Sequence, residues 1–163
     1  MPPERVRQAW REFIEGYVSV YGVNAAEYFP AVLTRGRREL AALMEVEPTE
    51  IAFTHGTADG MTKLANAFPF EKGDNVVITE EEHASNAIPW LGIEHKGVEI
   101  RFAASEEGVV PIKNIVALMD GRTRIVSTAS TYFCSGYAIN LKELGAECKK
   151  RGIFLAVDAI QSM

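Results

Sequence analysis

One short apolar segment near the end of the sequence limits the possible folds most strongly. Residues Phe154 to Val157 are apolar without interruption, and Asp158 follows them directly. Such a run is typical of a strand that is buried on both faces of a parallel sheet. Ligands of open α/β sheets bind just beyond the carboxyl ends of the strands, so Asp158 is a candidate ligand-binding carboxylate. Asp is also a favoured N-cap, and this segment alone leaves both interpretations open.

The rest of the chain alternates strand-like and helix-like segments. Apolar periodicity predicts helices over residues 5–20, 31–44, 85–93, 111–118 and 141–151, with a loop or short helix over 21–28. Residues 55–60 are predicted to lead into a further helix that ends at residue 67. It predicts strands over residues 50–54, 75–79, 98–103, 124–127 and 154–157. This order predicts an α/β fold of three layers, α/β/α, with a mostly parallel sheet. We expect a single domain over residues 1–163, without repeats or a low-complexity linker.

Composition excludes several classes of function. The chain has 163 residues, of which 47% are hydrophobic, and a net charge of −5. Scattered basic residues predict no nucleic-acid partner. No apolar segment approaches the roughly 20 residues of a membrane-spanning helix, and no signal-peptide core is present, so we expect a cytoplasmic protein. Cys134 and Cys148 lack metal-ligand spacing, which predicts reduced thiols and no metal site.

Three loops are expected at one edge of the sheet. The first contains Gly56, Thr57 and Ala58 between a predicted strand and a helix, an arrangement that suits an anion at a helix N-terminus. Glycine-threonine turns that only begin helices are also common. The second loop carries His83 after three glutamates, and its imidazole suits stacking on a flat ligand or an ordinary surface position. The third loop carries Asp158 and Gln161.

Pyridoxal 5′-phosphate (PLP) is the ligand that uses all three loops. Its phosphate suits the helix N-terminus, its ring suits a stacking imidazole, and its protonated pyridine nitrogen suits a carboxylate. A neighbouring anion raises the pKa of that nitrogen, and the protonated ring then withdraws electrons from the α-carbon of an amino acid.

The sequence also resembles the class V aminotransferase family, a branch of the fold-type I PLP-dependent enzymes. That branch includes cysteine desulfurases, isopenicillin N epimerase-like proteins and kynureninases. The resemblance extends over nearly the whole chain and is carried by four segments: Phe53 to Gly60, Glu82 to Asn86 with Pro89-Trp90, Ser135-Gly136 before Leu141, and Val157 to Ser162. It implies the large PLP-binding domain of these enzymes and an amino-acid substrate.

The resemblance implies a role for six residues. It assigns the phosphate to Gly56, Thr57 and Ala58. It places His83 on the cofactor ring, Asp158 at the pyridinium nitrogen and Gln161 at the phenolic oxygen. His83 and Asp158 are the implied catalytic residues, and no metal is implied.

Three positions depart from the desulfurase pattern. Ala58 stands where desulfurases usually carry Thr, which removes a hydroxyl from the phosphate site. Ser130 and Phe133 stand where they usually carry His and Asn. Because Phe133 cannot donate the hydrogen bond of that Asn, the loop is closer to the epimerase-like members than to a standard cysteine desulfurase.

The family comparison also implies that parts of the enzyme are missing. The Schiff-base lysine of the family lies beyond the segment that matches Asp158 and Gln161, and no lysine here is predicted at a matching strand end. We therefore expect a truncated chain that lacks the small C-terminal domain and is inactive alone. An open sheet edge and uncovered helix faces predict self-association, with a homodimer as the expected form.

Two alternatives belong to other functional classes. The chain is a non-catalytic, dimer-forming domain if it binds no PLP. A nucleotide hydrolase is suggested by an apolar strand that ends in Asp, the arrangement that holds Mg²⁺. The partner motif Gly-x-x-x-x-Gly-Lys-Ser/Thr is absent, which argues against the hydrolase.

Overall fold

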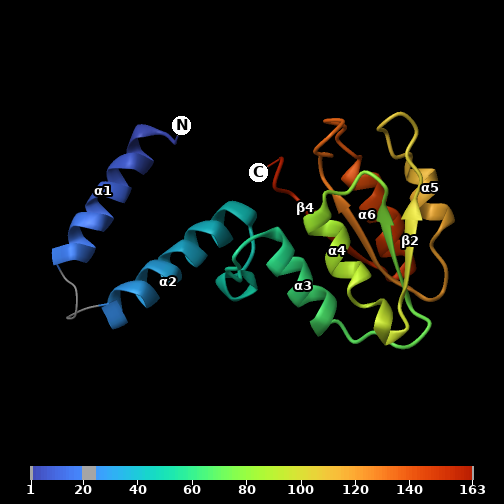
Figure 1. Cartoon of the computed structure of the whole chain (residues 1–163), viewed down its shortest axis with the longest axis horizontal. Coiled ribbons are helices and arrows are strands. Elements are labelled where there is room, and N and C mark those ends of the chain that lie inside the picture. The colour runs from blue at the N-terminus through green and yellow to red at the C-terminus, as the bar shows by residue number, and fades with distance from the viewer. Residues whose placement is uncertain (1, 20–24, 163) are drawn as a thin grey trace. The chain divides into compact units, whose positions relative to one another are not determined.

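The computed structural model describes residues 2–19 and 25–162. Their contacts divide the chain into two compact units, Met1–Phe53 and Thr54–Met163, which are considered separately below. Figure 1 labels the helices and strands in chain order.

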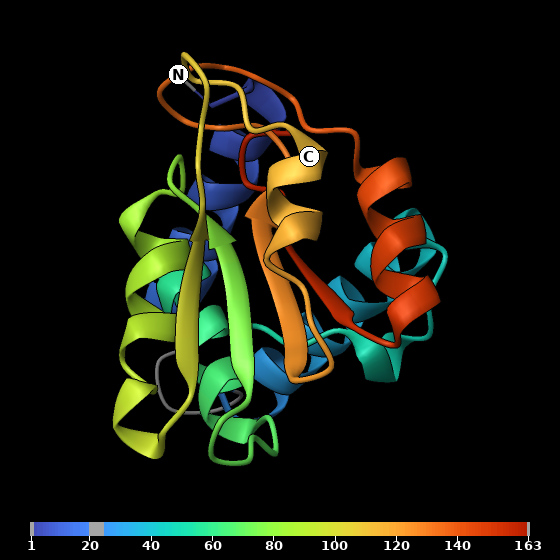
Figure 2. The ribbon, with the colours of Figure 1, turned by 90° about the vertical axis from the view of Figure 1, so that its right-hand side faces the viewer.

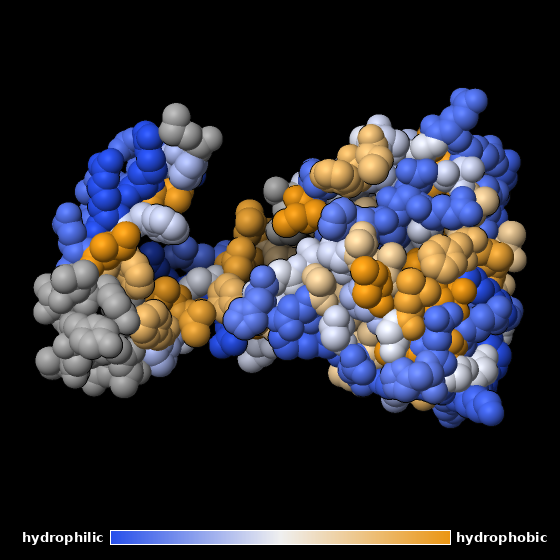
Figure 3. Space-filling view, viewed as in Figure 1, coloured by the Kyte–Doolittle hydropathy of each residue, from blue (hydrophilic) through white to orange (hydrophobic). Residues whose placement is uncertain are grey.

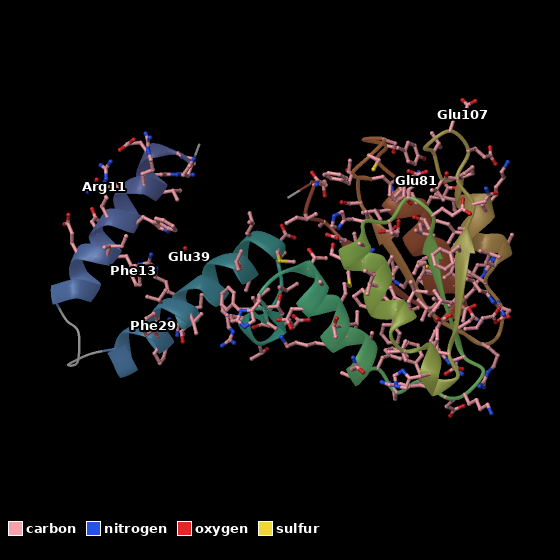
Figure 4. All side chains as sticks on the ribbon, viewed as in Figure 1. Arg11, Phe13, Phe29, Glu39, Glu81 and Glu107 are labelled. Atoms are coloured by element: carbon pink, nitrogen blue, oxygen red, sulfur yellow. The ribbon has the colours of Figure 1, made fainter. Side chains whose placement is uncertain are left out.

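The first unit is helical. It contains helix α1 (Glu4–Ser19), helix α2 (Ala25–Met44) and a 3-10 turn (Pro48–Glu50). Phe13 of α1 meets Phe29 of α2 edge to face, with ring centroids 6.4 Å apart (Figure 4). Other apolar side chains of both helices stay exposed, as the orange atoms over α2 in Figure 3 illustrate. These helices therefore leave several large apolar side chains exposed to solvent.

Two predictions for this unit are wrong. The predicted strand at residues 50–54 is not formed, because Pro48 begins a helical turn that a reciprocal bond between Glu47 and Glu50 stabilises. The carbonyl of Ile51 then accepts a hydrogen bond from Arg37 Nε (3.1 Å) instead of a strand partner. The second predicted helix begins at residue 25 instead of 31 and includes Pro30. A loop or short helix was predicted at 21–28, and residues 21–24 of it lie outside the described part of the chain. Residue 20, at the end of the first predicted helix, also lies outside that part.

The second unit is a parallel sheet with helices on both faces (Figure 2). Its strands are β1 (Asn75–Thr79), β2 (Glu99–Ala103), β3 (Thr123–Ala129) and β4 (Phe154–Asp158). Its α-helices are α3 (Thr57–Ala67), α4 (Ala84–Leu91), α5 (Ile112–Ala117) and α6 (Leu141–Arg151). The predicted α/β fold is confirmed, and these elements match the sequence-based ones within a few residues.

The apolar core of this unit lies in two separate layers. Val77 and Val126 face one layer together with the buried side chains of α5 and α6, such as Ile115 and Leu144. Val76, Ile78 and Ile125 face the opposite layer with buried residues of α3 and α4, including Ala65 and Trp90. Neighbouring residues of β1 and β3 thus point to opposite faces, as the continuous apolar runs in the sequence predict.

The strand order positions the functional edge. The sheet runs β2-β1-β3-β4, and all pairings are parallel. The chain passes from β1 to β2 on one side and then returns to β3 on the other side of β1, so the direction of strand addition reverses between β1 and β3. Ligand crevices of open α/β sheets form where such a reversal occurs. The β3–β4 register pairs Ala129 with Asp158 at the carboxyl edge. The loops that follow β1, β3 and β4 therefore converge at one place.

Candidate cofactor site

A cavity of about 200 Å³ lies at the carboxyl edge of the sheet. Four predicted site residues line it: Thr57, His83, Asp158 and Gln161. Its other walls are Ser85, Ala129, Thr131, Phe133 and Ile160. Gly56 and Ala58 flank Thr57 but do not line this cavity. It is smaller than the roughly 300–1,000 Å³ of typical small-molecule pockets.

Asp158 ends β4 with a buried carboxylate. The residue is only 6% exposed, and its Oδ1 accepts the N–H of Ile160 (3.1 Å). Its backbone carbonyl accepts the N–H of Ser130 (2.9 Å), which fixes the end of β4 against the loop after β3. Among the residues that the structure describes, none donates a hydrogen bond to Oδ2. The Asp158 side chain therefore caps a turn with one oxygen and keeps the other available at the cavity.

Helix α3 begins beside the cavity without a capping side chain. Its N-cap is Gly56, at φ 154° and ψ 177°. This conformation is essentially restricted to glycine, and the glycine offers no side-chain acceptor to the first N–H groups of the helix. Those groups and the Thr57 hydroxyl are suited to an anion. The loop does not follow a strand, contrary to the prediction, because residues 51–54 are irregular.

Local contacts of the preceding loop hold this helix start. The Thr54 hydroxyl donates to the carbonyl of Gly56 (3.2 Å), and the His55 N–H donates to Asp59 Oδ2 (3.0 Å). Asp59 also forms an ion pair with Lys63 one turn later. The Lys63 contact is the main reason why the pKa of Asp59 is lowered. The one carboxylate in the first turn of α3 is therefore already paired with a cation.

His83 is held at the start of α4. It is the N-cap residue, and its Nδ1 accepts the N–H of Ser85 (3.2 Å) and contacts the Ser85 hydroxyl (2.7 Å). A neutral imidazole in this arrangement carries its proton on Nε2. The ring of Phe133 approaches that of His83 edge to face, with centroids 5.6 Å apart. His83 thus caps α4 and also lines the cavity, and the stacking of its ring on a flat ligand stays a prediction.

Gln161 and its neighbours form the last wall. Gln161 is exposed in the turn after β4. The hydroxyls of Ser130 and Ser162 are 2.6 Å apart, which ties that turn to the loop after β3. Phe133 is 65% exposed and Ile160 is 71% exposed, so this side of the cavity is apolar.

Glu82 was not predicted as a site residue. It was noted only as one of three loop glutamates and as the start of a segment that carries the family resemblance, yet its carboxylate is partly buried and accepts hydrogen bonds from three donors. Burial raises its pKa, and the bonds from Asn86, Thr79 and Ala129 oppose that rise. Its position three residues after the end of a buried strand was the available signal, but charge patterning alone did not separate it from Glu80 and Glu81.

The described residues provide neither a lysine in the cavity lining nor a cluster of three potential metal ligands. The seven lysines all fall within residues 25–162, and none of them lines it. Across residues 2–19 and 25–162 there is no group of three His, Cys, Asp or Glu side chains arranged around a common point. In the same residues, no helix is both long and apolar enough to cross a membrane.

Known proteins share this architecture. In the cystine C–S lyase C-DES, 93% of this chain superposes on 42% of that protein with a TM-score of 0.83 and 20% identity; that structure carries glycine covalently linked to its PLP cofactor. The cysteine desulfurase CsdA of Escherichia coli gives a TM-score of 0.82 at 21% identity, over 99% of this chain and 43% of that one. These similarities support the fold.

Sequence comparison gives the family. A probable cysteine desulfurase of Methanothermobacter thermautotrophicus is 33% identical over 132 residues, which is 80% of this chain and 33% of that protein. A cysteine desulfurase of Cronobacter sakazakii is 28% identical over 99% of this chain and 42% of its own length. The chain thus spans between a third and about two fifths of these relatives. The family model for aminotransferase class V matches residues 1–163, so the chain belongs to the class V aminotransferases.

Proposed function

We propose that this chain is the cofactor-binding part of a PLP-dependent enzyme that acts at the α-carbon of an amino acid. The observation that carries the proposal is the shared cavity of Asp158, His83 and Thr57. These residues come from three separate loops and supply a buried carboxylate, a flat ring and a helix N-terminus. Family membership supports the same cofactor.

The donor set fits PLP. Asp158 is only 6% exposed, and no described residue donates to its Oδ2, which suits a protonated ring nitrogen. The uncapped start of α3 suits a dianionic phosphate. His83 offers a planar ring whose orientation is fixed by Ser85. Ala58 contributes no hydroxyl, so Thr57 is the side-chain donor proposed at the phosphate.

Each residue has one proposed task. When bound, PLP supplies an electron sink for charge that develops at the α-carbon of the substrate. Asp158 holds a proton on the ring nitrogen by pairing with it, and its burial strengthens the pairing. His83 covers one face of the ring and excludes water from it. Gln161 donates its amide N–H to the phenolic oxygen, and Gly56 gives the backbone the conformation that exposes the N–H groups of α3.

This chain alone is proposed to bind PLP without a covalent bond. None of its lysines lines the cavity, so covalent attachment has no candidate amine there. Catalysis therefore belongs to a longer protein that supplies one. In such a protein the relatives suggest cysteine as the substrate.

A second candidate substrate class follows from Phe133. Its ring meets that of His83 edge to face at the cavity wall, and this apolar side chain cannot donate a hydrogen bond to a substrate. An isopenicillin N epimerase-like reaction at the α-carbon is therefore the alternative to sulfur abstraction. Comparing the longer protein on cysteine and on amino acids with apolar side chains separates the two.

We also propose a homodimer in the cytoplasm. Trp10, 71% exposed, and Ile14 lie on the apolar face of α1, and Leu43 of α2 is similarly exposed. Several exposed apolar side chains on two helices are typical of a surface that another chain covers. Two free thiols, Cys134 and Cys148, are consistent with a reducing compartment.

The cofactor proposal is tested by adding PLP to the purified chain. Wild type is expected to shift the visible absorption of PLP and to induce a circular dichroism band. Asp158→Asn is expected to weaken binding about tenfold or more, because a charge-assisted hydrogen bond is lost. Glu94→Gln, which removes an exposed carboxylate outside the cavity, is the control. Absence of any induced band in folded wild type contradicts the proposal and favours a non-catalytic domain.

A further inference from the structure

Glu82 connects the strands that carry the candidate site. Its Oε1 accepts the hydroxyl of Thr79, the last residue of β1 (2.8 Å). The N–H of Ala129, the last residue of β3, lies 3.0 Å from both carboxylate oxygens. The two strand ends on either side of the reversal in strand order are therefore held by one side chain.

The same carboxylate holds the start of α4. Asn86 Nδ2 donates to Glu82 Oε2 (2.7 Å), and Ser127 Oγ donates to Asn86 Oδ1 (2.8 Å). Asn86 and Ser127 are fully buried. Because α4 begins directly after His83, these bonds fix the helix whose first turn orients the imidazole.

The connection reaches Asp158 through β3. Ala129, which donates its N–H to Glu82, is the register partner of Asp158 in β4 and lines the cavity beside it. Glu82, which directly precedes His83 in the sequence, is thus hydrogen-bonded to the strand partner of Asp158. Glu81, one residue earlier, has no hydrogen bond or ion pair within the described part of the chain, although it lies on the same loop (Figure 4).

We propose that Glu82 is a positioning residue that holds His83 and Asp158 at the spacing required by a planar heterocycle. This inference rests on the proposed PLP site. The role requires a carboxylate, because a carboxylate accepts from all its donors, whereas a glutamine turns an NH₂ group toward some of them. Glu82→Gln keeps the size of the side chain and removes this property.

The test measures His83 and the cofactor separately. The ¹⁵N shifts of the His83 imidazole in the purified chain report its tautomer without any ligand. Wild type is expected to give one neutral tautomer, protonated at Nε2, because Nδ1 accepts from Ser85. Glu82→Gln is expected to give mixed tautomers and about tenfold weaker binding of PLP, with a smaller induced dichroism band at saturation.

Two controls separate positioning from loss of stability. Glu81→Gln removes the adjacent charge and should leave both readouts as in wild type. Asp74→Asn weakens an ion-pair cluster at the start of β1, at the opposite edge of the sheet, and should lower the melting temperature without moving the His83 shifts. If Glu82→Gln does not fold, Thr79→Val removes a single donor to Glu82 and is expected to give intermediate changes.

The outcomes are distinct. Unchanged His83 shifts and PLP affinity in a folded Glu82→Gln or Thr79→Val chain overturn the inference, as does an equal effect of Asp74→Asn. If wild type binds no PLP, the proposed function fails. The ¹⁵N shifts then decide alone: a change confined to the Glu82 and Thr79 variants supports positioning of His83, and no change overturns it.

Discussion

Phe133 approaches His83 edge to face, with ring planes inclined at 70° and centroids 5.6 Å apart. The contact joins the loop after β3 to the start of α4 across the mouth of the cavity. Aromatic rings prefer this geometry because the positive edge of one ring meets the electron-rich face of the other. The apolar side chain therefore has a definite place at the site.

Phe133→Ala tests how much this ring contact contributes to the free energy of unfolding. Because the ring is mostly exposed, we expect the free energy of unfolding to fall by only about 0.5–1.5 kcal/mol in urea denaturation. Ile88→Ala removes an exposed apolar side chain of α4 and should change stability by less than about 0.5 kcal/mol. Equal losses in both variants would mean that the ring contact adds nothing beyond ordinary surface burial.

We expect any side chain at position 56 to lower the stability of the fold. A Cβ there has no heavy atom within 4 Å, so the cost of Gly56→Ala is purely conformational. We expect a loss of about 1–3 kcal/mol in thermal unfolding, and weaker PLP binding as the start of α3 moves. Gly121→Ala also meets no atom within 4 Å and has no strained φ, so its stability should be unchanged. A Gly56→Ala chain as stable as wild type contradicts the assigned backbone conformation.

The ion pairs of Asp74 lead us to expect that the folded chain is less stable in acid. It is 1% exposed, and its Oδ1 lies 3.1 Å from Arg124 Nε and 3.3 Å from Arg122 Nε. Burial alone raises the pKa of Asp74, but the hydrogen bond from the Glu71 N–H and the ion pair with Arg124 together lower it by more, so the net pKa lies below its usual value. Its contribution is therefore present above the unfolded pKa of about 3.9 and is lost as pH falls through the folded pKa.

Urea unfolding between about pH 6 and pH 2.5 measures this contribution. Wild type should lose stability steadily over the acid range. Asp74→Asn should be less stable at pH 6 by about 1–3 kcal/mol, with a flatter dependence on pH. Glu107→Gln, on the exposed loop between β2 and α5, is the control (Figure 4). Parallel pH profiles of wild type and Asp74→Asn would exclude Asp74 as the source.

Trp10 is expected to take part in self-association. Its exposed indole is the largest apolar group on α1, and covering it stabilises a dimer. Light scattering coupled to gel filtration should show a dimer for wild type and a shift toward monomer for Trp10→Ser. Glu15→Gln on the same helix should leave the mass unchanged. A monomeric wild type at all concentrations rules out the dimer.

The sheet was predictable from sequence, whereas the first unit was less so. The run Val76 to Ile78 carries its strand signal in a few adjacent residues, since both faces of β1 are buried. The run Phe154 to Val157 also forms a strand, but the prediction that it is buried on both faces is wrong, because β4 lies at the edge of the described sheet and Phe154 is 65% exposed. Residues 50–54 have similar β propensity, but Glu47 and Pro48 favour a helical turn just before them. Strand formation also depends on a neighbouring strand, which local propensity does not encode.

The site was predictable for residues that follow strands or begin helices. His83 and Asp158 were found because chain position places them at the carboxyl edge, and the cavity joins them to Thr57 and Gln161. Glu82 was missed because its role depends on donors from residues 79, 86 and 129, which approach only in the folded chain. The roles of all six predicted site residues at the cofactor stay predictions, and Gly56 and Ala58 do not line the cavity.

The pairing of Ala129 with Asp158 has a consequence for how this sequence can change. The same alanine amide is the donor to Glu82, so its place along the strand is fixed from both sides. The register of β3 against β1 is regular from residue 125 on, and inserting or deleting one residue between 125 and 128 would turn every following side chain of the strand toward the other layer. Length variation among natural homologues should therefore avoid this segment and concentrate in the turn at residues 133–136.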